Sequence, residues 1–405
     1  MAMMVYCEDG RLATVGFGSA TLAYTRLAGT DFVAGYRWYT GGSTFLTVDY
    51  AYDRYLRLTE IRANGETVAA YTLDGDDRRL TSELADGSVW NYTYDEIGQI
   101  AGAVRTGKNA MSYAYDGIGN RLTAEEDGEA TEYVANQLNQ YTRIGTEEPS
   151  YDADGDMLSW NGWSYAWNSE KRLVNAEKGS CRVEADYDYM GRRFEKKVYD
   201  GGVLTKHLRF VYDGCKLIAI HDALDGDRQV MTFVWQPEGA GLDVPLAMTW
   251  NEAAYFYICD GNKNVIAMTD SSGTRVAEYI YAPFGRILHL EGELAEINPF
   301  RFSSEYHDDE TSLVYYNYRY YNPTLGRWTK RDPMEESGGI NTYTFVSNRP
   351  TNLIDLRGLE WIIKRESDKD RAIVTLTNPS MDTFESLQKR VGHDSTGAFG
   401  EQGWA

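Results

Sequence analysis

Short stretches of alternating apolar and polar residues recur along most of the chain, and turn-forming residues separate them. Residues 89–94 (Val-Trp-Asn-Tyr-Thr-Tyr) alternate as a half-buried strand requires. Dipeptides such as Asn64-Gly65 and Asp127-Gly128 stand between such stretches, and they favour tight hairpin turns. Long amphipathic helix patterns are scarce. The pattern therefore predicts an all-β chain with many short strands.

The pattern of strand and turn repeats at a fixed interval in the first third of the chain. An aspartate in a turn can accept hydrogen bonds from backbone N–H groups two residues on, and glycine supplies the positive φ that such a turn needs. Because one hairpin is not stable alone in water, we expect the repeats to share a continuous sheet. The repeat is marked by four aspartates spaced 21 residues apart: Asp53, Asp74, Asp95 and Asp116.

Further along, the repeats become longer and less regular, as at Tyr187-Asp188. We interpret the turn aspartates as backbone acceptors, which is the usual role of aspartate in a turn. The alternating carboxylates of Asp152, Asp154 and Asp156 leave calcium as an alternative, although the EF-hand spacing and its terminal Glu are absent. We expect no metal and no cofactor.

Composition narrows the classes of partner. The chain of 405 residues has 40 Lys and Arg against 61 Asp and Glu, a formal charge of −21, which argues against nucleic-acid binding. No apolar run is long enough for a transmembrane segment, and the N-terminal residues lack the pattern of a signal peptide. Export, if it happens, needs a non-classical route or a longer parent chain. The four cysteines are far apart and are expected to be free thiols.

The C-terminal third carries motifs that are far more specific than the repeats. Residues 281–286 read Tyr-Ala-Pro-Phe-Gly-Arg, and residues 315–328 contain Tyr-Arg-Tyr-Tyr-Asn-Pro-Thr-Leu-Gly-Arg-Trp. Arg-Asp-Pro follows at 331–333, and Asp-Leu-Arg-Gly-Leu closes the segment at 355–359. This segment resembles the Rhs-associated core domain, and the repeats resemble the YD repeats of the Rhs family. Relatives of that family include toxin-complex C proteins and teneurins.

The resemblance implies a spiralling β-sheet shell, a partial or complete cocoon, with the core domain curling inward at its C-terminal end. We expect four segments on this basis. They are N-terminal strands with incomplete repeats (1–50), the YD-repeat shell (51–280), the Rhs-associated core domain (281–359) and a variable tail, interpreted as a toxin remnant (360–405).

The resemblance also implies an activity. Self-cleaving members of the family cut their chain after the leucine of a DPxGL signature by an aspartic-protease-like reaction. Here the signature comprises Asp355, Gly358 and Leu359, and the cut would fall between Leu359 and Glu360. Asp355 is expected to position this signature.

Two residues match catalytic positions of the family directly: Asp332, in the Arg-Asp-Pro motif, and Arg319. For the second carboxylate we choose Asp309 over its neighbour Asp308. Two aspartates held close share a proton, so that one takes a proton from water and the other polarises the carbonyl. An arginine beside them can orient one carboxylate. The expected enzyme is a single-turnover autoprotease.

Other interpretations of these residues remain open. Asp332 before Pro333 is also a common turn starter, and Arg319 in a Tyr-rich strand can stack on rings or pair with a carboxylate. The proline of the signature is replaced here by Leu356, which loosens the turn before the scissile bond and can slow the cut.

The leading hypothesis is a shell that releases or presents its own C-terminal polypeptide in toxin delivery or bacterial competition. Its partners would be that polypeptide, secretion-apparatus or upstream shell components, and an immunity protein. It would be secreted or at the cell surface, or cytoplasmic before delivery. The alternatives are a surface scaffold that binds glycans or proteins through its aromatic sheet, and an inactive gene remnant.

Overall fold

The computed structural model describes residues 3–7, 11–237, 243–359 and 361–363, which form antiparallel strands joined by turns. Each strand of the first sheet pairs with the next strand in sequence, from β1 to β14, and the second sheet continues in the same way from β15 to β28. A four-stranded sheet (β29–β32) and a two-stranded sheet (β33–β34) follow. The prediction of an all-β fold is confirmed.

The strands of the first sheet are β1 (Met3–Tyr6), β2 (Leu12–Phe17), β3 (Ala20–Arg26), β4 (Val33–Thr40), β5 (Ser43–Tyr52), β6 (Leu58–Ala63), β7 (Glu66–Leu73), β8 (Arg79–Leu84), β9 (Val89–Tyr94), β10 (Ile100–Arg105), β11 (Ala110–Tyr115), β12 (Arg121–Glu126), β13 (Glu129–Ala135) and β14 (Tyr141–Ile144). Those of the second sheet are β15 (Ser150–Tyr151), β16 (Met157–Trp160), β17 (Trp163–Trp167), β18 (Leu173–Lys178), β19 (Cys181–Tyr187), β20 (Arg193–Asp200), β21 (Val203–Asp213), β22 (Lys216–Asp222), β23 (Arg228–Trp235), β24 (Pro245–Trp250), β25 (Ala253–Cys259), β26 (Val265–Asp270), β27 (Arg275–Tyr281) and β28 (Ile287–Glu291).

The remaining elements are short. They are β29 (Tyr306–Asp308), β30 (Leu313–Tyr315), β31 (Tyr320–Asn322), β32 (Arg327–Trp328), β33 (Leu353–Asp355) and β34 (Trp361–Ile363), with 3-10 helices η1 (Phe302–Ser304), η2 (Glu335–Gly338) and η3 (Val346–Asn348). Over the described ranges, no helix has the length and apolar character needed to cross a membrane.

Each repeat aspartate closes a turn between two strands. After β9, one oxygen of Asp95 accepts the backbone N–H groups of Ile97 (3.1 Å) and Gln99 (2.8 Å), and the other accepts the Gln99 side chain (2.7 Å). Gly98, the fourth residue of this turn, has φ +85. The predicted role of these aspartates as backbone acceptors is confirmed. Equivalent backbone bonds occur at Asp53, Asp74 and Asp116.

The tyrosine before the aspartate joins neighbouring repeats. The hydroxyl of Tyr94 donates to the carbonyl of Arg79 (2.6 Å), and that of Tyr115 donates to the carbonyl of Ile100 (2.9 Å). Each acceptor is the first residue of the strand that follows the previous aspartate turn: Arg79 begins β8 and Ile100 begins β10. The Tyr-Asp pair therefore has two tasks, because the aspartate closes one turn while the tyrosine fixes that turn to the previous one.

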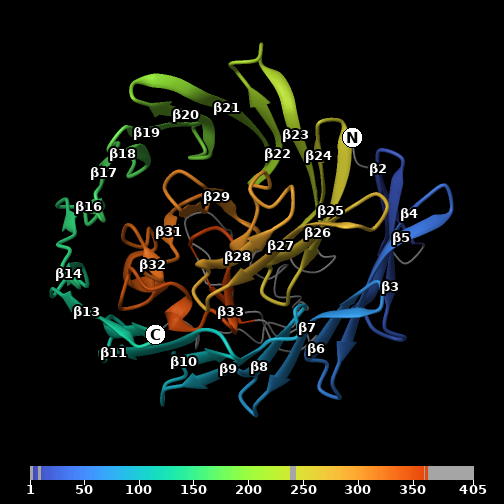
Figure 1. Cartoon of the computed structure of the whole chain (residues 1–405), viewed down its shortest axis with the longest axis horizontal. Helices are drawn as coiled ribbons and strands as arrows, with labels where there is room; N and C mark the ends of the chain where they lie inside the picture. Colours follow the sequence, from blue (N-terminus) through green and yellow to red (C-terminus); the bar gives the residue numbers. More distant parts are fainter. Residues whose placement is uncertain (1–2, 8–10, 238–242, 360, 364–405) are drawn as a thin grey trace, which may run out of the picture.

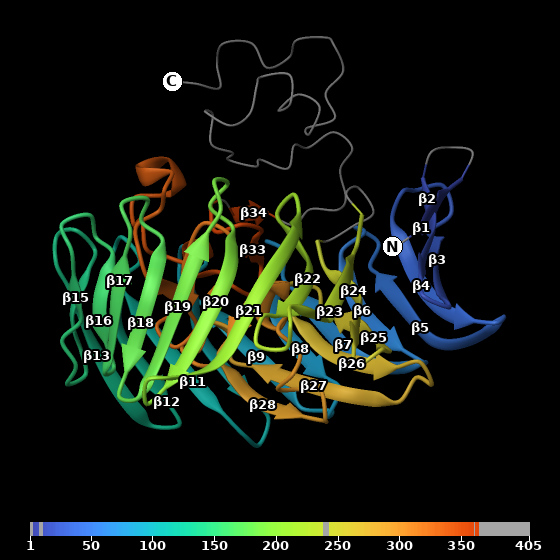
Figure 2. The ribbon, with the colours of Figure 1, turned by 90° about the horizontal axis from the view of Figure 1, so that it is seen from above.

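The two large sheets bend into a ring (Figure 1). The ring closes where one face of β2–β7 packs against β23–β26, and there the rings of Trp38 and Phe256 lie 4.7 Å apart. Residues 292–359, which we call the plug, lie inside the ring in Figure 1, and Figure 2 shows part of this segment rising above one rim of the shell. The structure thus shows a β-shell with the C-terminal segment curled inward.

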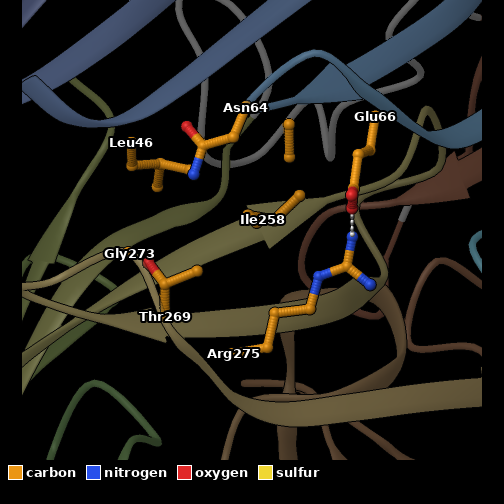
Figure 3. A pocket seen from close by; sticks show the side chains of 8 residues that line it. Leu46, Asn64, Glu66, Ile258, Thr269, Gly273 and Arg275 are labelled. Carbon is orange, nitrogen blue, oxygen red and sulfur yellow. Dashed lines mark hydrogen bonds and ion pairs between the residues drawn. The ribbon is translucent and has the colours of Figure 1, made fainter.

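A cavity of about 360 Å³ remains where the two sheets face each other (Figure 3). Arg275 spans it and pairs with Glu66 of the opposite sheet (3.3 Å) and with Glu278 (3.1 Å). Asn64 bonds to the backbone of the neighbouring hairpin. Arg275, Glu66 and Asn64 thus have protein partners here, whereas the Thr269 hydroxyl is buried with no hydrogen-bond partner among the described residues. We treat the cavity as the space between the two layers.

The plug is held by the turns at one rim of the shell. Six consecutive Asp or Asn turns each present a backbone carbonyl, two or three residues after the Asp or Asn, and a plug side chain donates a hydrogen bond to it. Five of these bonds are 2.7–2.9 Å long. The donors and the carbonyls are Asn352 to Asp77, Arg349 to Ile97, Asn348 to Gly119, Arg327 to Asn139, Tyr343 to Gly155 and Lys330 to Lys171.

A buried ion cluster fixes the plug to β20. Asp308 of the plug pairs with Arg193 and Lys196 of the shell, each at 2.6 Å, and these three side chains are at most 3% exposed. Lys196 also pairs with Glu310 (2.6 Å). Burial alone would raise the pKa of Asp308, but the charges of Arg193 and Lys196 hold it well below its usual range. Asp308 is therefore a charged anchor between shell and plug.

Asp308→Asn is expected to lower the free energy of unfolding by about 3–5 kcal/mol, because Arg193 would remain buried without its carboxylate. Urea-induced unfolding followed by tryptophan fluorescence measures this change. Asp200→Asn, at the exposed end of β20, is the matched control and should change the midpoint little. Equal midpoints for the two variants would contradict the anchor role.

Candidate functional site

Arg319 lies in a tight turn between β30 and β31. The turn is closed by two backbone hydrogen bonds between Tyr316 and Arg319, of 3.0 and 3.2 Å. The guanidinium stacks over the ring of Trp328 at 4.0 Å, and the Arg319 side chain is only 3% exposed. A planar guanidinium that is stacked in this way has its N–H groups directed at fixed positions.

Arg319 joins the two sequence motifs of the plug. Its Nη1 lies 2.7 Å from Oδ2 of Asp332, and its Nη2 lies 3.4 Å from Oδ2 of Asp355. Its Nε donates to the carbonyl of Gly358. The arginine therefore contacts the Arg-Asp-Pro motif, the aspartate of the Asp-Leu-Arg-Gly-Leu segment and the backbone of that segment at once.

Asp332 is held from its own loop. One carboxylate oxygen accepts the N–H of Met334 (2.8 Å), and the other faces Arg319. Burial raises the pKa of Asp332, and Arg319 opposes this effect. Gly338 of η2 passes so close that a Cβ there would lie 2.5 Å from Oδ2 of Asp332. The loop packs against the carboxylate without leaving room for a side chain.

Asp355 organises the segment that follows it. Its Oδ1 accepts the backbone N–H groups of Arg357 (3.0 Å), Gly358 (2.7 Å) and Leu359 (3.3 Å). Burial raises the pKa of Asp355, whereas Arg319 and the backbone N–H groups lower it. One oxygen therefore fixes the turn, and the other faces Arg319.

This turn is the loop of a hairpin. Asp355, at the end of β33, pairs with Trp361 of β34, and Leu353 pairs with Ile363. Residues 356–359 follow β33 in this loop, and the predicted scissile bond comes directly after Leu359. Glu360 and residues 364–405 of the predicted tail lie outside the described residues.

Asp309 lies apart from the group around Arg319. It is 49% exposed and pairs with Arg301 at 2.6 Å, while the second carboxylate at Arg319 is that of Asp355. The structure thus brings Arg319, Asp332, Asp355 and Gly358 together and does not bring Asp309 to them. The catalytic roles of all these residues stay predictions.

Two further charged residues lie beside this group, and the sequence analysis did not select them. They are Lys263, in the turn between β25 and β26, and Glu305, just before β29. Both face Asp355. The available sequence signal was weak: Lys263 stands at a turn position that several other repeats give to glycine, as at Gly98, but Lys171 also occupies it. In the part of the chain that the structure describes, no group of three His, Cys, Asp or Glu residues is arranged to hold a metal ion.

Comparison with known proteins bears on the family of the chain. The family model for the teneurin YD-shell matches residues 85–351, well over half of the chain. The chain belongs to the teneurin YD-shell family. It is an Rhs/YD-repeat shell protein related to toxin complexes.

Relatives of this YD shell include toxins. The tRNA3(Ser)-specific nuclease WapA of Bacillus spizizenii is 30% identical over 68% of the chain and 11% of its own length. Toxin protein Tse5 of Pseudomonas aeruginosa is 27% identical over 87% of the chain and 29% of its own length, and human Teneurin-4 is 25% identical over 78% and 11%. The YD shell spans about a tenth of the length of the WapA proteins it matches.

A solved structure shares the fold. The crystal structure of TcdB2-TccC3-Cdc42 matches 88% of this chain and 21% of its own chain, with a TM-score of 0.68 and 19% identity. At that identity, the likeness establishes the fold of the shell.

Gly338→Ala is expected to lower the free energy of unfolding by about 1–3 kcal/mol, because its Cβ would overlap the carboxylate of Asp332. Urea unfolding measures the effect. Gly75→Ala is the matched control, since a Cβ at Gly75 meets no atom within 4 Å, and it should change stability by less than about 0.5 kcal/mol. If the two variants are equally stable, the packing of η2 on Asp332 is not tight.

Proposed function

We propose that this YD shell cuts its own chain between Leu359 and Glu360 and so releases or presents the polypeptide that follows. The observation that carries the proposal is the contact of Arg319 with Asp332, Asp355 and the Gly358 carbonyl. Two buried carboxyl groups around one guanidinium, one residue from the predicted cut, suit peptide hydrolysis by an aspartic-protease-like reaction.

We assign the second carboxylate to Asp355 in place of Asp309. In the reaction, one carboxylate of the Asp332–Asp355 pair takes a proton from water, and the oxygen of that water adds to the carbonyl carbon of Leu359. The protonated partner polarises the carbonyl and then supplies the proton that the leaving nitrogen of Glu360 takes as the C–N bond breaks. The products are a carboxylate at Leu359 and an amine at Glu360.

The position of the loop supports a reaction within one chain. The three N–H groups that Asp355 binds hold residues 357–359 against Arg319. A substrate that is tethered in this way reaches a high effective concentration at the carboxylates. The cut would run once per chain, because the substrate is part of the enzyme.

The relatives support the biological setting that we propose. WapA is named as a tRNA nuclease and Tse5 as a toxin protein, so a role in toxin delivery and bacterial competition suits this YD shell. Its partners would be its own C-terminal polypeptide, toxin-complex or secretion components and an immunity protein. The protein would be secreted or delivered.

Intact-mass measurement of the expressed chain tests the cut. Wild type should give two products whose masses add up to the uncut chain plus one water, with one product ending at Leu359. Asp332→Asn and Asp355→Asn should give only the uncut chain, because neither variant keeps two carboxyl groups. A single uncut mass for folded wild type would contradict the proposal and would favour a non-enzymatic scaffold.

Asp309→Asn decides between the two candidates for the second carboxylate. With Asp355 as the partner of Asp332, the folded Asp309→Asn protein should cleave like wild type. Loss of cleavage in Asp309→Asn together with normal cleavage in Asp355→Asn would return the role to Asp309. Circular dichroism of each variant shows whether the shell has folded.

A further inference from the structure

Lys263 is buried at a turn position where the equivalent lysine of another repeat is exposed. It is the fourth residue of the turn that begins at Asp260, and its φ of +67 is disfavoured for residues with a side chain. Lys171 holds the same place in the turn that begins at Asn168, also with positive φ, and its side chain is 48% exposed against 1% for Lys263. The ammonium of Lys263 is therefore turned inward, toward the plug.

The inward ammonium meets two carboxyl groups of the plug. Its Nζ lies 3.8 Å from Oε1 of Glu305, and the charge of Asp355 also acts on it. Burial lowers the pKa of Lys263, and Glu305 and Asp355 oppose that effect. One buried cation thus pairs with Glu305 and lies within the electrostatic influence of Asp355, which contacts Arg319.

The two carboxyl groups differ in how a negative charge on them is stabilised. Asp355 has Arg319 and three backbone N–H groups, whereas the ion pair of Glu305 is the long contact with Lys263. Burial, with the nearby charge of Asp355, raises the pKa of Glu305 to about 8, although Lys263 and Lys216 lower it. The charge of Glu305 also acts on the buried hydroxyl of Tyr316. A negative charge on Glu305 is accordingly the less stabilised of the two.

We propose that Glu305 and Lys263 are positioning residues of the cleavage site. Glu305 keeps a proton beside Asp355, and Lys263 is then left to balance the negative charge of Asp355. An ionised Glu305 would repel the Asp355 carboxylate and compete with it for Lys263, which would disturb the turn at 355–359. This inference rests on the proposed function and adds a pH limit to it.

The rate of self-cleavage as a function of pH tests this inference. The full chain is unfolded in urea, diluted into buffers between pH 6 and pH 9.5 and stopped with acid, and the cut fraction is read by intact mass. The wild-type rate should fall roughly tenfold per pH unit above about pH 8, as for the loss of one proton. Glu305→Gln should cleave within a few-fold of wild type at pH 7 and should lack this fall.

Lys263→Met should move the fall to higher pH, because the cation that favours ionised Glu305 is gone. Glu170→Gln and Lys171→Met are the exposed controls and should keep the wild-type profile. If Glu305→Gln keeps the alkaline fall, or is slower by the same factor at every pH, Glu305 has no such role and the inference is wrong.

A second measurement needs no cleavage. A group whose pKa is higher in the folded state contributes stability at low pH, and this contribution is lost as the pH rises toward the folded pKa. We therefore compare the urea midpoints of Asp332→Asn and Asp332→Asn/Glu305→Gln. The midpoint of the single variant should fall relative to that of the double variant as the pH rises from 5 to 8, and the difference should then stay constant. A difference that is the same at every pH would overturn the inference even if no protein cleaves. Absence of cleavage in wild type, with this difference present, would contradict the proposed function alone.

Discussion

The shell depends on an aspartate or asparagine whose side-chain oxygen binds two backbone N–H groups of its own turn. In the Asp95 turn these are the N–H groups of Ile97 and Gln99, and the bonds hold Gly98 with positive φ. This conformation presents a turn carbonyl at the rim, where a plug side chain binds it. A local rule of four or five residues thus creates the binding surface for a segment that lies 159–275 residues further along the chain.

Much of the shell could be predicted because its information is local. The alternating strands, the spacing of the aspartates and the dipeptide Asn64-Gly65 each determine the backbone of their neighbours. The closure of the ring could not be predicted, since the contact of Trp38 with Phe256 joins distant segments that carry no mark of one another. The same holds for Asn348, an ordinary asparagine in sequence that bonds to the carbonyl of Gly119.

The candidate site could likewise be predicted only in part from the sequence. The motifs identified Arg319 and Asp332, and the structure places them 2.7 Å apart. The choice between neighbouring carboxylates was harder: Asp308 is buried against Arg193 while Asp309 is half exposed. Which carboxylate reaches Arg319 depends on how the β33–β34 hairpin packs on the turn before β31. That packing is tertiary, so spacing along the chain does not reveal it.

The six bonds between plug side chains and turn carbonyls have a consequence for how such shells change in evolution. Inserting or deleting a repeat between the turns at Asp74 and Asn168 would shift every carbonyl after the change by one turn relative to its plug donor. Several of the six hydrogen bonds would then be lost together. The number of repeats between the Asp74 and Asn168 turns can therefore change only together with the plug. A change before the Asp74 turn would leave these six bonds in place, but it would act on the face of β2–β7 that closes the ring.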